Sequence, residues 1–179
     1  LIDPAMIQHL VDALAQHRLL HQDDADDKKL VEHLINSSGA KVVCGGTAAQ
    51  IVSSELGREI VTSTQFIDPK VPPIAYIEGI DLVTEGVLTL ARTRDLIVKY
   101  INPRSEYSEL RQLSRGDGAS KLSRILVGAT DITFLLGRAI NPAHQNPDFP
   151  KDLSIKLNIV KEIIETLRNM GKIVRTVYF

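Results

Sequence analysis

The spacing of apolar residues along the chain changes near residue 38. Before that point, Met6, Leu10 and Leu14 recur on one face of a predicted helix. An acidic run at 23–27 is typical of the N-terminus of a second helix, because carboxylates favour the positive end of the helix dipole. We therefore predict an N-terminal helical pair over residues 1–38, packed on the rest of the chain.

After residue 38, short runs rich in β-branched residues alternate with segments of helical spacing. Strands are expected at 41–44, 59–63, 80–84, 131–136 and 172–179. Helices are expected between them, among others at 47–56, 87–100, 121–127 and 154–170. The alternation predicts an α/β fold, with a three-layer, mostly parallel sheet of about five strands and helices on both faces. Residues 39–179 are expected to form one compact α/β unit.

The composition excludes several classes of protein. With 44% hydrophobic and 24% charged residues among 179, the chain resembles an ordinary globular domain. A net charge of −1 and 4% aromatic residues argue against a nucleic-acid partner, and no apolar run approaches the ~20 residues of a membrane span. Cys44, the only cysteine, is expected to be a small buried residue. A single cysteine also favours a reducing, cytoplasmic compartment.

Candidate ligand-binding residues follow three of the predicted strands, at the edge where open α/β sheets bind ligands. The first group is the turn Gly45-Gly46-Thr47. Its glycines let the backbone approach a ligand, and the following helix directs free amides and a positive dipole end at the turn. These three residues are therefore predicted to bind an anion. The alternative is a tight turn without a ligand, in which Thr47 only caps the helix.

The second group is Thr84-Glu85. A carboxylate directly after a buried strand can act as a base, a nucleophile or an acceptor for ligand hydroxyls. Glu85 is therefore a candidate catalytic residue and Thr84 a candidate ligand contact. The alternative for Glu85 is to cap the next helix.

The third group lies in a proline-rich loop at 138–147. Arg138 can hold a carboxylate or phosphate through paired hydrogen bonds, Asn141 can bind a polar part of the ligand, and His144 is a candidate catalytic proton carrier. The alternative is a polar surface loop without a ligand. No metal-binding or cofactor motif is present, so neither a metal nor a cofactor is expected.

Three segments of the chain resemble one protein family. They are Val42–Ala48, Pro72–Leu90 and Ala139–Pro147. The likeness extends over most of residues 39–179 and is to the C-terminal region of bacterial SpoIIE-type serine phosphatases of anaerobes. It implies an accessory domain that follows a catalytic phosphatase domain of the metal-dependent 2C type, whose metal-binding elements would lie upstream. A start at Leu1 without methionine agrees with a piece of a longer protein.

These observations predict a regulatory domain that binds a small anionic metabolite or nucleotide, with the upstream phosphatase domain as its partner in the parent chain. The alternative is an enzyme. The Gly-Gly-Thr turn and Glu85 also resemble sugar-phosphate isomerases and coenzyme A transferases, and phosphatase activity could belong to the parent chain. A third possibility is a structural or homo-oligomeric domain, for which an exposed apolar strand or helix face at a terminus is the feature to seek.

Overall fold

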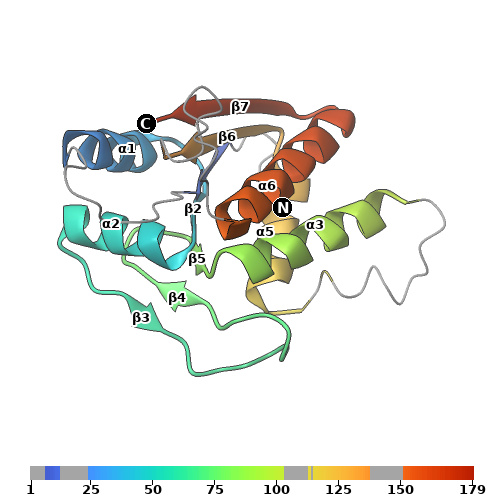
Figure 1. Cartoon of the computed structure of the whole chain (residues 1–179), viewed down its shortest axis with the longest axis horizontal. Coiled ribbons are helices and arrows are strands. Elements are labelled where there is room, and N and C mark those ends of the chain that lie inside the picture. Colours follow the sequence, from blue (N-terminus) through green and yellow to red (C-terminus); the bar gives the residue numbers. More distant parts are fainter. Residues whose placement is uncertain (1–6, 13–23, 103–112, 114, 138–150) are drawn as a thin grey trace.

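The computed structural model describes residues 7–12, 24–102, 113, 115–137 and 151–179. The predicted α/β class is confirmed, because strands and helices alternate along one sheet (Figure 1). The elements are β1 (Ile7–Asp12), α1 (Asp24–Asn36), β2 (Lys41–Cys44), α2 (Gly46–Leu56), β3 (Val61–Thr62), β4 (Ala75–Tyr76), β5 (Leu82–Thr84), α3 (Val87–Ile101), α5 (Gly118–Gly128), β6 (Asp131–Leu136), α6 (Lys151–Asn169) and β7 (Ile173–Tyr178). None of these described helices combines the length and the apolar character needed to cross a membrane.

The strands form one mixed sheet of seven strands in the order β3-β4-β5-β2-β1-β6-β7. The neighbouring pairs β5–β2, β2–β1, β1–β6 and β6–β7 are all parallel. In contrast, β4 pairs antiparallel with both β3 and β5. The expectation of about five mostly parallel strands is therefore corrected to a larger, mixed sheet. The chain returns from β3 to β4 through a loop without a crossover helix, and a direct return of this kind gives antiparallel pairing.

The prediction of the first N-terminal helix is wrong for the residues that the structure describes there, because residues 7–12 form the strand β1. This strand lies between β2 and β6, and Leu10 is opposite both Val42 and Phe134. Periodicity alone does not separate a short buried strand from a helix, and backbone pairing on two sides favours the strand. The second helix of the pair is present as α1.

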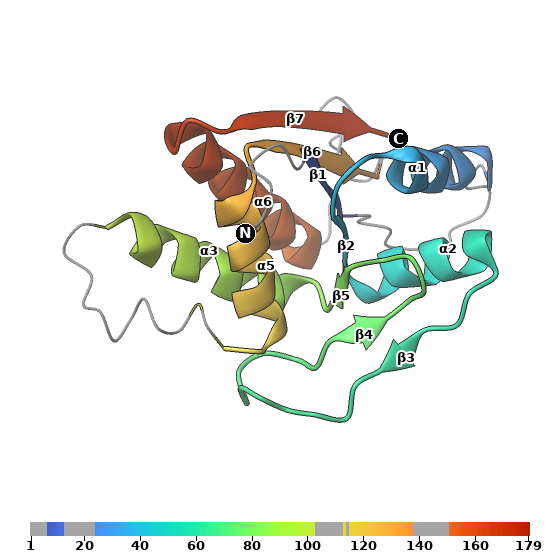
Figure 2. The same ribbon diagram turned by 180° about the vertical axis from the view of Figure 1, so that it is seen from behind.

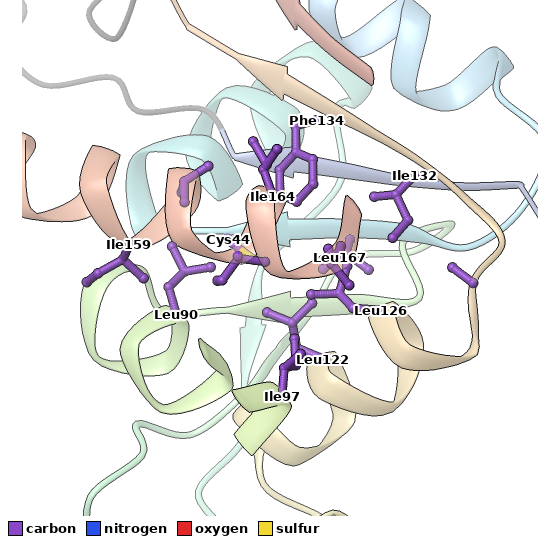
Figure 3. Packing of buried hydrophobic residues seen from close by; sticks show 14 of the residues in the cluster. Cys44, Leu90, Ile97, Leu122, Leu126, Ile132, Phe134, Ile159, Ile164 and Leu167 are labelled. Carbon is purple, nitrogen blue, oxygen red and sulfur yellow. The ribbon is translucent and has the colours of Figure 1, made fainter. Parts of the chain in front are cut away.

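Helices cover both faces of the sheet (Figures 1 and 2). The helices α1 and α2 pack on one face, and α3, α5 and α6 pack on the other. Successive residues of β2 alternate between the two sides: Val43 belongs to the α1–α2 cluster, whereas Val42 and Cys44 belong to the opposite one. Cys44 is fully buried in the same cluster as Leu90 and Ile164 (Figure 3), which agrees with its expected place in the core.

Polar contacts hold both ends of α5. At its start, the buried Asp117 carboxylate accepts the Ser120 amide at 2.9 Å and the Ser120 hydroxyl at 2.7 Å. At its end, the amine of Lys172 donates to the carbonyl oxygens of Val127 and Ala129, and burial lowers the pKa of Lys172. These contacts satisfy backbone groups that a helix leaves without partners at its ends. They therefore stabilise both ends of α5.

Candidate functional site

The turn after β2 brings the start of α2 to the carboxyl edge of the sheet. Gly45 has a φ of 116° and a ψ of 143°, a conformation that is essentially restricted to glycine. Its amide donates to the Thr84 carbonyl oxygen at 2.8 Å, which ties this turn to the end of β5. The helix begins at Gly46 with no side-chain cap, so the capping alternative for Thr47 is wrong. Thr47 is exposed in the first helical turn.

The turn after β5 leads into α3 in a similar way. Thr84 is buried, and its hydroxyl donates to the Glu85 carbonyl oxygen at 2.9 Å. The exposed Glu85 carboxylate accepts the Leu88 amide at 3.2 Å, in the first turn of α3. The Glu85 side chain therefore makes the contact of a helix cap, which is the alternative to the predicted catalytic role.

A lysine from α6 lies between these two turns. Lys156 is only 6% exposed, and its amine donates to the Cys44 carbonyl oxygen at 3.3 Å. A Cβ atom at Gly45 would lie 3.1 Å from the Lys156 nitrogen, and a Cβ atom at Gly86 would lie 3.4 Å from it. The ammonium therefore occupies space that side chains at the two glycines would fill. We call Gly45, Gly46, Gly86 and Lys156 the glycine–lysine site.

Two sources of positive potential meet at the glycine–lysine site. One is the Lys156 ammonium, and the other is the N-terminus of α2, which is equivalent to about half a positive charge and has no side-chain cap. The N-terminus of α3 is already capped by the Glu85 carboxylate. The first-turn amides of α2 are not used by the hydrogen bonds of the helix itself. Amide and ammonium donors match the oxygens of a phosphate or a carboxylate, so the arrangement suits a small anion.

The structure brings two of the three predicted strand ends together, through the hydrogen bond from Gly45 to Thr84. The third does not enter the described site: Arg138, Asn141 and His144 lie outside the residues that the structure describes, and their roles stay predictions. Within the described ranges, no group of three or more histidine, cysteine, aspartate or glutamate side chains is placed to hold a metal ion.

Sequence reasoning missed Lys156, although its position carries a signal. The buried residues of α6 include Lys156, Val160, Ile163 and Leu167, which follow the helical spacing i, i+4, i+7 and i+11. A lysine in phase with an apolar stripe is directed at the core, where lysines are rarely buried unless paired. The neighbouring Ile155, in contrast, is 49% exposed.

The comparisons with known proteins found no relative of this chain. No protein-family model, no curated protein and no solved structure matches the chain. Its function is therefore inferred from the glycine–lysine site and from the resemblance of the sequence segments described above.

Proposed function

We propose that this protein binds a small anionic metabolite or nucleotide at the glycine–lysine site. The observation that carries the proposal is the place of Lys156, whose buried ammonium lies against Gly45 and Gly86 where α2 and α3 begin. A phosphate or carboxylate bound there gains from the ammonium and from the uncapped start of α2 at once. Burial strengthens these interactions, because the effective dielectric constant is lower than that of water.

The parallel direction of β2 and β5 supports this location, because it brings both carboxyl ends to one edge of the sheet. Numbered in chain order, the parallel strands β1, β2, β5, β6 and β7 lie in the order 3-2-1-4-5 across the sheet. We take this as a three-layer arrangement in which helices cover both faces of a largely parallel sheet, which is the finer architecture expected from the sequence. Sheets of this kind bind ligands outside the carboxyl ends of their strands. The glycine–lysine site lies at the carboxyl ends of β2 and β5, one strand away from the β1–β6 boundary where the strand order reverses.

The resemblance to the C-terminal region of SpoIIE-type phosphatases suggests what the binding is for. In the parent chain, ligand occupancy would change the activity of an upstream phosphatase domain. This requires two states of the parent chain with different affinities for the ligand. The proposal therefore describes a bacterial, cytoplasmic accessory domain rather than an enzyme. We do not extend it to isomerase or transferase chemistry, because the Glu85 carboxylate is exposed and bonded to the Leu88 amide.

Thermal and urea unfolding in the presence of anions test the proposal. The probes are inorganic phosphate, ribose 5-phosphate, AMP, ADP and acetate, each titrated to saturation. A ligand at ~100 times its dissociation constant should raise the free energy of unfolding by ~2.7 kcal/mol. The same titrations on Lys156→Met should show no stabilisation.

The matched control is Lys161→Met, which removes an exposed lysine from the same helix and should respond like the unchanged protein. A response that is equal in Lys156→Met and Lys161→Met would place the binding elsewhere. No stabilisation of the unchanged protein by any of the probes would contradict the proposed function itself.

A further inference from the structure

The strand β7 is an open edge of the described sheet. It pairs with β6 on one side only, and it runs along the border of the sheet in Figure 2. Ile173 is 52% exposed and Tyr178 is 41% exposed. Its six residues include no proline and no lysine, two residues with which proteins commonly protect an edge from pairing. The edge is therefore able to accept another strand.

The contacts with β6 define which backbone groups of β7 face outward. The amides of Ile173 and Phe179 both donate toward the β6 side, at 2.9 Å. Alternate residues of a strand direct their backbone groups to opposite sides, so the even-numbered residues, with Thr176 in the middle, point away from the sheet. Arg168 agrees with this assignment, because its guanidinium donates to the Val174 carbonyl oxygen at 3.2 Å.

We propose that two copies of this chain associate by antiparallel pairing of their β7 strands, centred on Thr176. The two seven-stranded sheets would then form one continuous sheet of fourteen strands. Two-fold pairing of β7 with β7 is favoured over head-to-tail pairing of β7 with β3, because β3 has only two residues and offers too little strand to pair with β7. A two-fold pairing also closes the assembly, since each copy uses its one long edge.

Side-chain complementarity supports pairing in this register. When Thr176 is opposite its counterpart, Arg175 is opposite Val177 of the other copy, and Ile173 is opposite Phe179. Like charges are then not directly opposed, and the apolar residues at the two ends of the strand meet. The Arg175 guanidinium lies 3.5 Å from the Asp131 carboxylate of its own chain, which offsets its charge at the pairing surface.

Disulfide trapping tests the proposed register. In Thr176→Cys, the two cysteines would be directly opposite, with Cα atoms about 5.5 Å apart, which is within the range of a disulfide. In the control Ile173→Cys, a similarly accessible site, the two positions would be about 20 Å apart. The native Cys44 is buried and does not compete. We expect at least tenfold more cross-linked dimer from Thr176→Cys; equal yields, or none, overturn the register.

Solution mass tests the association itself. Sedimentation equilibrium of the full chain at 10–100 µM should give the mass of two chains, and Thr176→Ala should do the same. The Thr176 amide points away from β6 and makes no hydrogen bond to it, so the Thr176→Pro variant should still fold. Because proline has no amide to donate to a second copy, this variant should give the mass of one chain. A one-chain mass for the unchanged protein overturns the proposal, whatever the proline variant does. Anion binding is measured separately, so neither result depends on the other.

Discussion

The amine of Lys156 lies 3.3 Å from the carbonyl oxygen of Cys44, although 112 positions separate the two residues. The contact joins α6, which covers one face of the sheet, to the carboxyl end of the central strand β2. Two glycines make it possible, since a Cβ atom at Gly45 or Gly86 would crowd the ammonium. If this lysine serves a ligand rather than the fold, the two roles can be separated by mutation.

Lys156→Met should leave the free energy of unfolding of the ligand-free protein unchanged or raise it by about 1–2 kcal/mol. The physical reason is that methionine removes the cost of burying a charge and fills a similar volume with a flexible apolar side chain. Urea denaturation without added anions measures the difference. A loss of about 3–5 kcal/mol would instead assign Lys156 a structural role.

Gly45→Ala should lower the free energy of unfolding by about 1–3 kcal/mol, because Gly45 has a φ of 116° that an alanine adopts only with strain. The matched control is the adjacent Gly46→Ala. A Cβ atom at Gly46 would meet no atom within 4 Å, and the residue already begins α2. The two variants are compared by urea denaturation, and equal effects would contradict the assigned backbone geometry.

Asp117→Ala should destabilise the protein by about 1–2 kcal/mol, because it removes the N-cap of α5 and leaves the Ser120 amide without its acceptor. Asp117→Asn keeps an acceptor oxygen and should cost less. Thermal unfolding of both variants provides the measurement. If the asparagine and alanine variants lose the same stability, the hydrogen bond is not the source of the effect.

The amides of residues 8–11 should exchange slowly with solvent, because β1 is paired on both sides by β2 and β6. Leu10→Pro should cost more than about 1 kcal/mol, the net value of one hydrogen bond, because a proline cannot donate within a central strand. Native-state hydrogen exchange and urea denaturation test the two statements. Fast exchange over residues 8–11 would contradict the pairing of β1 on both sides.

Local patterns were sufficient for part of this structure. Alternating strand and helix segments predicted the α/β class, since each segment carries its own periodicity. Consecutive glycines at Gly45-Gly46 predicted a turn at a strand end, because such a turn depends on nearby backbone conformation. The core position of Cys44 followed from the apolar run that contains it.

Tertiary structure decided the remainder. Residues 7–12 form a strand because two neighbouring strands offer hydrogen bonds, and neither neighbour is close in the sequence. For the same reason, Lys156 could not be assigned to the site from its own helix: its amine donates to a backbone carbonyl oxygen distant in the sequence, and such a contact leaves no mark in the sequence. The amino-acid sequence by itself thus determined the α/β class and the glycine turn after β2, whereas long-range packing determined the central strand β1 and which groups meet at the site.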